Sequence, residues 1–145
     1  MIKIICVGKL KEKYLNDLIN DYKTRINKYH KLEIIELKDS NTKQEAKEIL
    51  KHINNNEYVI PLCINGKELS TLEFKSTIEN LLTSGYSNIT FIIGGSDGLD
   101  EEVINKGNIK ISFSKLTYPH GLFRGILLEQ IYRAFKIMNN ETYHK

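Results

Sequence analysis

The segment after the apolar run 89–93 has the residue types of a ligand-binding turn. It contains Gly94 and Gly95 and leads into three carboxylates at positions 100–102. Glycines at the end of a buried strand let a ligand approach the backbone closely, so they favour a binding site there. Carboxylates at the start of a helix oppose a bound phosphate, which favours a nucleotide ligand without phosphates, such as S-adenosylmethionine. A turn with a purely structural role explains the same residues equally well.

A polar loop with aromatic residues, 113–118, connects the apolar run 109–113 to the last predicted helix. Its backbone N–H and C=O groups could pair with the edge of an adenine ring. Pro119, directly after it, fits the first turn of the helix that follows. The segments 64–66, 94–95 and 113–118 all follow predicted strands of the same sheet, so we expect them to line one crevice.

The end of the chain gathers groups suited to proton transfer and to anion binding, at Tyr143, His144 and Lys145. Histidine titrates near neutral pH, and lysine can stabilise an anion or contact a phosphate. Chain ends commonly fray, so a tail without a function is the alternative. Arg124 and Arg133 are nine residues apart on a predicted helix and point in roughly opposite directions, so they need not serve one site.

The remaining reactive residues have simpler explanations. Cys6 and Cys63 lie in apolar runs and form no spaced pair, which favours buried reduced thiols over a zinc site or a disulfide. His30 and His52 fall at predicted exposed positions and should be solvated. A basic surface is predicted near the start of the chain, either simply solvated or tracking the phosphates of a nucleic acid. Its members are Lys9, Lys11, Lys13, Lys23, Arg25, Lys28 and Lys31.

The composition fits a single domain over residues 1–145, because 41% apolar residues suffice for one core. The net charge of +3 permits a polyanionic partner without requiring one. The first apolar run is too short for a signal peptide, and no stretch is long enough to cross a bilayer. We therefore expect a cytoplasmic protein with no membrane partner and no metal.

Apolar runs and helical periodicities alternate along the chain. Strands are predicted at 2–7, 32–37, 58–64, 89–93 and 109–113, and helices at 10–29, 42–53, 70–83, 100–105 and 119–138. Thr42 with Glu45, and Ser70 with Glu73, have the spacing of capping boxes, and Asn65-Gly66 has the composition of a turn. The alternation predicts an α/β fold, with a mostly parallel sheet covered by helices on both faces.

The last predicted helix is apolar around most of its circumference, whereas a surface helix needs a single apolar stripe. Its second apolar face must be covered by the chain itself or by a partner subunit. In a chain of this size we favour a partner, and therefore a homodimer. A helix covered by its own polar tail is the alternative.

Four segments in order, 2–14, 91–99, 112–120 and 128–145, resemble the RlmH family, the SPOUT-class methyltransferases of pseudouridine in large-subunit ribosomal RNA. The resemblance extends over essentially the whole chain. It implies methylation at N3 of a pseudouridine with S-adenosylmethionine as the methyl donor, on assembled ribosomes. It also implies a homodimer and a SPOUT fold with a trefoil knot near the C-terminus.

The resemblance also implies site residues. Those for the cofactor are Leu62, Gly94, Phe113, Ser114, Lys115, Leu116, Thr117 and Tyr118. Those for catalysis and substrate are Tyr143, His144 and Lys145, with Arg133 and His120 near them. His144 would act as a base, Lys145 would stabilise an anion, and Tyr143 would orient or stack on the base. A non-catalytic RNA-binding or ribosome-binding module of the same fold is the alternative.

Three features depart from the family pattern. Cys63 stands where a carboxylate is common, and Gly125 lies inside the last helix, where it should cost about 1 kcal/mol of helix stability. The segment 38–44 looks shorter than usual, which should affect only a surface loop.

Overall fold

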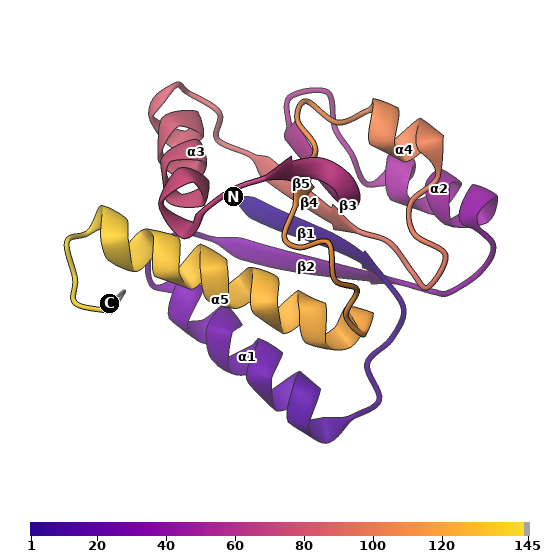
Figure 1. Ribbon diagram of the computed structural model, residues 1–145, viewed down its shortest axis with the longest axis horizontal. Helices are drawn as coiled ribbons and strands as arrows, with labels where there is room; N and C mark the ends of the chain where they lie inside the picture. The colour runs from indigo at the N-terminus through magenta and orange to yellow at the C-terminus, as the bar shows by residue number, and fades with distance from the viewer. Residues whose placement is uncertain (144–145) are drawn as a thin grey trace.

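Five parallel strands form the central sheet in the order β2-β1-β4-β3-β5 (Figure 1). The computed structural model describes residues 1–143. The strands are β1 (Ile2–Val7), β2 (Leu32–Leu37), β3 (Tyr58–Glu68), β4 (Ile89–Ile93) and β5 (Ile111–Ser112). The helices are α1 (Lys13–Asn27), α2 (Thr42–Lys51), α3 (Thr71–Thr83), α4 (Glu101–Asn105) and α5 (His120–Met138). The predicted fold class is confirmed; the trefoil knot stays a prediction.

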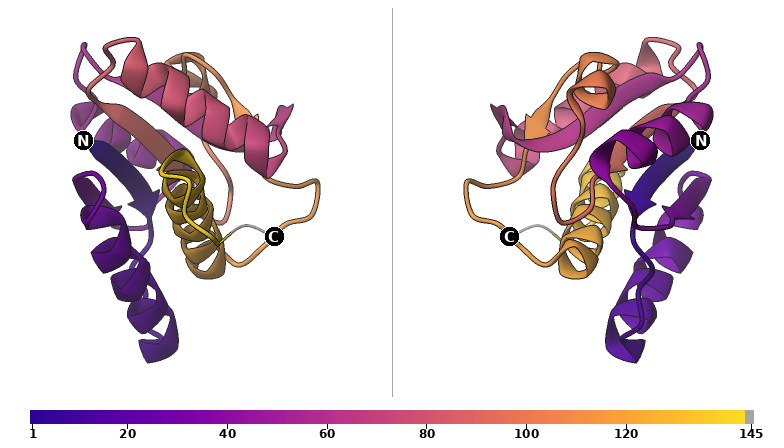
Figure 2. Two further views of the ribbon diagram at one scale, coloured as in Figure 1. Left: turned by 90° about the vertical axis from the view of Figure 1, so that its left-hand side faces the viewer. Right: turned by 90° about the vertical axis from the view of Figure 1, so that its right-hand side faces the viewer.

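Helices cover both faces of the sheet (Figures 1 and 2). Along β1, Ile4 and Cys6 face a core shared with α1, α3 and α5, whereas Ile5 and Val7 face a smaller core shared with α2 and α4. This alternation follows from the two-residue period of a strand. β4 lies between β1 and β3 and is buried along its whole length, as its continuous apolar run predicts.

α5 lies between α1 and α3 on one face of the sheet, so its own chain covers the second apolar face. Two glycines allow α1 to come close. A Cβ atom on Gly121 would lie 3.0 Å from Cδ1 of Leu15, and one on Gly125 would lie 2.7 Å from Cδ2 of Leu18. The apolar circumference of α5 is therefore no argument for a partner subunit, and Gly125 has a packing role that offsets its cost in helix stability.

Two of the predicted local signals were wrong. β3 continues through Asn65-Gly66, because Gly66 packs on β5: a Cβ atom there would lie 2.6 Å from the carbonyl carbon of Ile111. Asn41 caps α2 instead of Thr42; its Oδ1 accepts a hydrogen bond from the Gln44 N–H at 2.9 Å. The capping box of Ser70 with Glu73 at the start of α3 is confirmed.

Burial agrees with the prediction at Cys6 but not at Cys63 or His30. Cys6 is buried, and its thiol donates to the carbonyl of Ile35 at 3.4 Å, but Cys63 is only half-buried. His30 stacks on Phe135 with the ring centroids 5.9 Å apart, so it is not simply solvated. None of the helices within residues 1–143 is long and apolar enough to cross a membrane.

Candidate functional site

A cavity of about 710 Å³ opens at the carboxyl ends of β4 and β5, beside the middle of β3. Such a volume is typical of small-molecule sites, and this edge of a parallel sheet is where α/β proteins bind their ligands. Its lining is mainly apolar and aromatic, with Leu62, Ile64, Ile93, Leu99, Ile104, Leu116, Tyr118 and Phe123 among its members. Hydroxyl groups of Ser96, Ser114 and Thr117 add hydrogen-bonding capacity.

The three segments that the sequence placed at one crevice do converge on this cavity. Gly94 and Gly95 follow β4, and the loop after β5 closes another side, whereas Ile64 lies within β3 and does not follow it. Within that loop Phe113, Ser114, Leu116, Thr117 and Tyr118 line the cavity, but Lys115 does not. Asn65 and Gly66 also lie outside the lining, because β3 carries them on toward β5.

The glycines after β4 form a tight turn over residues 95–98. The Gly98 N–H donates to the Gly95 carbonyl at 3.0 Å, and Gly98 has a φ of 76°, which favours glycine. A Cβ atom on Gly94 would lie 2.7 Å from the carbonyl carbon of Gly98. The fold of the turn thus requires glycine at 94, and the same turn forms one wall of the cavity.

The cavity is poor in positive charge. Among the described residues that line it, none is a lysine or arginine, and the charged or titratable side chains include Asp97 and His120. Asp100 caps α4, and the Lys43 ammonium together with the Glu102 N–H holds the pKa of Asp100 below its ordinary value. Among the described lining residues, a phosphate would therefore meet the Asp97 carboxylate and no lysine or arginine, which agrees with the sequence-based argument; the preference for a ligand without phosphates stays a prediction. Within residues 1–143, no group of three or more histidine, cysteine, aspartate or glutamate side chains could hold a metal ion.

His120 begins α5 and lies at the junction of the cavity with the end of β1. A Cβ atom on Gly8 would be 2.9 Å from Nε2 of His120 and 3.3 Å from Oδ2 of Asp39. The imidazole and this carboxylate therefore flank one glycine, which has a φ of 101°. Sequence reasoning missed Asp39, because no local motif marks a residue that only the order of the strands brings to His120.

Arg124, one turn further along α5, ties that helix to the sheet. Its side chain is 1% exposed; Nη1 lies 2.6 Å from Oε2 of Glu36, and Nη2 donates to the Gly8 carbonyl at 3.0 Å. These contacts join the start of α5 to the ends of β1 and β2. An arginine in a helix gives no sequence signal of burial, so the sequence singled out Arg124 without predicting its burial or its pairing with Glu36.

The other predicted catalytic residues lie at the far end of α5. Arg133 pairs with Glu129 at 2.6 Å, and its guanidinium lies 4.7 Å from the ring centroid of Tyr143. Along the helix axis Arg133 is about 20 Å from His120. In Figure 1 the C-terminal end of α5 lies at the left of the molecule, away from the loop that follows β5. His144 and Lys145 lie outside the described residues. Of the three catalytic candidates within residues 1–143, His120 alone lines the cavity.

Known proteins resemble this chain in both sequence and fold. A family model described as "Predicted SPOUT methyltransferase" matches residues 1–144. The ribosomal RNA large subunit methyltransferase H of Enterococcus faecalis is 52% identical over 99% of both chains. A probable methylase family protein of Haemophilus influenzae, 11% identical, has a similar fold, with a TM-score of 0.60 over 99% of this chain and 70% of its own.

A further solved structure with this fold was determined with a ligand. It is the SpoU methyltransferase AviRb of Streptomyces viridochromogenes in complex with AdoMet; it is 8% identical, with a TM-score of 0.50 over 90% of this chain and 56% of its own. The family-model match and the identity over nearly the full length agree with the resemblance found in the four sequence segments. The chain therefore belongs to the SPOUT methyltransferase family and, within it, to the family of large-subunit ribosomal RNA methyltransferases H.

Proposed function

We propose that this protein transfers a methyl group from S-adenosylmethionine to N3 of a pseudouridine in large-subunit ribosomal RNA, on assembled ribosomes. The observation that carries the proposal is the cavity at the carboxyl edge of the sheet, walled by the glycine turn and the loop 113–118, with no lysine or arginine among its described lining residues. The names of the full-length relatives support methylation of large-subunit ribosomal RNA, and the AdoMet bound to a protein of the same fold supports the choice of methyl donor.

The donor groups of the cavity fit this cofactor. Backbone groups of the loop 113–118 would hold the adenine edge, and Leu62 with Phe123 would provide apolar contact to the ring. The carboxylate of Asp97 offers opposite charge to a cationic ligand. When bound, the cofactor supplies a methyl group activated by a positively charged sulfur.

The chain must also take a proton from the acceptor nitrogen. The N3–CH₃ bond forms as the S–CH₃ bond breaks with its electron pair left on sulfur, and the N3 proton passes to a base. An imidazole can accept that proton at neutral pH, and His120 lines the cavity. His144 in the tail is the second candidate, with Lys145 able to stabilise a deprotonated base.

A role for the tail requires a second copy of the chain. Tyr143 packs at the end of α5 that lies away from the cavity, where its ring meets Tyr132 at 5.1 Å. The cavity rim exposes apolar side chains, with Ile64 54%, Leu116 70% and Tyr118 39% accessible. Such a patch is typical of an interface. The protein therefore acts as a homodimer in which the tail of one subunit serves the cavity of its partner.

Transfer of label from methyl-labelled S-adenosylmethionine tests this function. Assembled ribosomes, separated subunits and bare ribosomal RNA are offered in parallel, and label is counted in each RNA. Label in large-subunit RNA, highest with assembled ribosomes, supports the proposal. Ribosome binding without label transfer would support the non-catalytic module instead. Deletion of residues 143–145 should abolish transfer while cofactor affinity is retained, and transfer at the wild-type rate by that variant would remove the tail from the mechanism.

A further inference from the structure

The segment 8–14, which joins β1 to α1, lies directly beside the cavity. Gly8 lies against the imidazole of His120. Leu10 packs against Gly121, where a Cβ atom would be 2.5 Å from Cδ2 of Leu10. His120 lines the cavity, so segment 8–14 adjoins its wall. Figure 2 (right) shows the start of α5 between this segment and the loop that follows β5.

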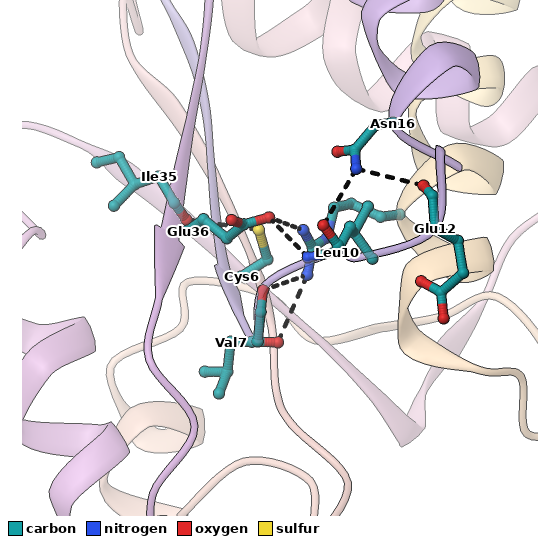
Figure 3. Close-up of polar contacts among 9 residues, drawn as sticks. Cys6, Val7, Leu10, Glu12, Asn16, Ile35 and Glu36 are labelled. Atoms are coloured by element: carbon teal, nitrogen blue, oxygen red, sulfur yellow. Dashed lines mark hydrogen bonds and ion pairs between the residues drawn. The ribbon is translucent and has the colours of Figure 1, made fainter. Parts of the chain in front are cut away.

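A polar network holds segment 8–14 in place (Figure 3). Oε2 of Glu36 accepts from the Leu10 N–H at 3.4 Å and from the buried guanidinium of Arg124. The side-chain amide of Asn16 donates to the carbonyl of Leu10 at 3.1 Å and to that of Glu12 at 3.3 Å. The backbone is thus fixed before any ligand arrives, which lowers the entropy cost of binding through this segment.

The side chains that segment 8–14 presents to solvent are suited to a nucleic acid. Lys9 and Lys11 are exposed on either side of the half-buried Leu10, and within residues 1–143 neither forms an ion pair or a hydrogen bond. Lys13 differs, because it pairs with Asp17 at 2.8 Å. Tyr14 is 70% exposed, so its ring is free to stack on a base.

The cavity itself has no lysine or arginine among its described residues, so an RNA that enters must find its phosphate contacts outside it. An enzyme that reacts with one base of a structured RNA takes that nucleotide out of the stack, which leaves the flanking phosphates at the mouth of the site. Free lysines beside that mouth meet this requirement, whereas lysines elsewhere on the surface do not.

We propose that Lys9 and Lys11 bind backbone phosphates of the ribosomal RNA next to the target nucleotide, and that Tyr14 stacks on an unpaired base of the same strand. This inference rests on the proposed function, because it takes ribosomal RNA as the substrate. In this proposal segment 8–14 positions the RNA substrate, and the cavity binds the cofactor.

The charge part of the proposal is tested with Lys9→Ala/Lys11→Ala against a control of equal charge change, Lys47→Ala/Lys106→Ala. The control lysines are exposed on α2 and at the end of α4, on the opposite face of the sheet. Binding to assembled ribosomes and to a large-subunit RNA transcript is measured across a salt series. The Lys9/Lys11 variant should bind more weakly, and its logarithmic salt slope should fall by about 1.4–1.8, since each lost phosphate contact removes about 0.7–0.9.

The aromatic part is tested with Tyr14→Ala and Tyr14→Phe. Loss of a stacked base weakens RNA binding by about fivefold or more, while Tyr14→Phe keeps the ring and should bind as the wild type does. S-adenosylmethionine affinity and the thermal unfolding midpoint are measured on every variant, so that loss of fold or of the cofactor site is recognised.

Each outcome decides the proposal. A smaller salt slope for Lys9→Ala/Lys11→Ala alone, with cofactor affinity unchanged, supports it. Equal slopes for that variant and the Lys47/Lys106 control would overturn it, as would a wild-type protein that binds neither ribosomes nor RNA. A wild-type protein that binds but transfers no methyl group contradicts the proposed function only, because the salt slopes still report on the RNA surface.

Discussion

Gly8 and His120 meet so closely that a Cβ atom on the glycine would lie 2.9 Å from Nε2 of the imidazole. The end of β1 and the first residue of α5 therefore touch without room for a side chain between them. Since His120 also lines the cavity, the position of this candidate base depends on a glycine far away in the sequence.

Substitution of Gly8 by alanine should affect both stability and activity. The positive φ of 101° alone costs about 1–3 kcal/mol, and the new methyl group would displace His120 or Asp39. Gly85→Ala is the matched control, because Gly85 has a φ of 96° and no atom within 4 Å of its Cβ position. Urea unfolding should show both losses, but only Gly8→Ala should slow methyl transfer. Equal activity of the two variants would contradict the placement of His120.

The two cysteines should differ in reactivity toward iodoacetamide. Burial raises the pKa of the Cys6 thiol to about 11, whereas Cys63 is half-buried and lines the cavity. Mass spectrometry at pH 8 should find Cys63 alkylated well before Cys6, and S-adenosylmethionine should slow the reaction at Cys63. Undiminished labelling with saturating cofactor would argue that the cofactor binds elsewhere.

His30 should make the fold sensitive to mild acid. Burial, and secondarily the Met1 ammonium, lowers the pKa of this imidazole below its ordinary value of 6.5. As the pH drops through 6.5, the unfolded chain therefore binds a proton at His30 before the folded chain does. The free energy of unfolding falls as the pH drops through 6.5 and below. Between pH 7.5 and a pH below 6.5, the free energy of unfolding of His30→Gln should decline less than that of the wild type. Parallel curves for the two proteins would refute the assignment.

A buried ion pair lies at the amino ends of the strands, opposite the carboxyl ends that line the cavity. It should stabilise the fold without contacting the cofactor. Nζ of Lys3 lies 2.5 Å from Oε1 of Glu57, and Thr90 donates to the second oxygen of the same carboxylate at 2.9 Å. Lys3→Met should cost about 3–5 kcal/mol of unfolding free energy, because it leaves a buried charge without its partner.

The double variant Lys3→Met/Glu57→Leu should recover much of that loss, since it removes both charges. Calorimetric titration should give both folded variants the wild-type affinity for S-adenosylmethionine. A double variant as unstable as Lys3→Met alone would show that packing, and not the unpaired charge, dominates.

The fold class and the convergence on one cavity could be predicted from local signals. The continuous apolar run of β4, the capping box at Ser70 and the glycines after β4 each depend on residues adjacent in the sequence. Asn65-Gly66 wrongly indicated a turn. The glycine that suits a turn also lets β3 pass close to β5 at Gly66.

What the sequence could not show are contacts between distant segments. The pairing of Arg124 with Glu36 spans 88 residues, and the approach of Asp39 to His120 depends on β1 lying between β2 and β4. The apolar circumference of α5 suggested a partner subunit, but α1 and α3 cover it within the chain. Periodicity tells which faces of a helix are buried and is silent on what buries them.

The proposed methylation of N3 of a pseudouridine by the cavity-bound cofactor can be measured directly. Its most direct test is nucleoside mass spectrometry of large-subunit RNA after incubation of assembled ribosomes with the protein and deuteromethyl-labelled S-adenosylmethionine. The label should appear in N3-methylpseudouridine, and a Thr117→Trp variant, which fills the cavity, should yield none. Label found only in another nucleoside, or undiminished in the filled-cavity variant, would contradict the proposed methylation.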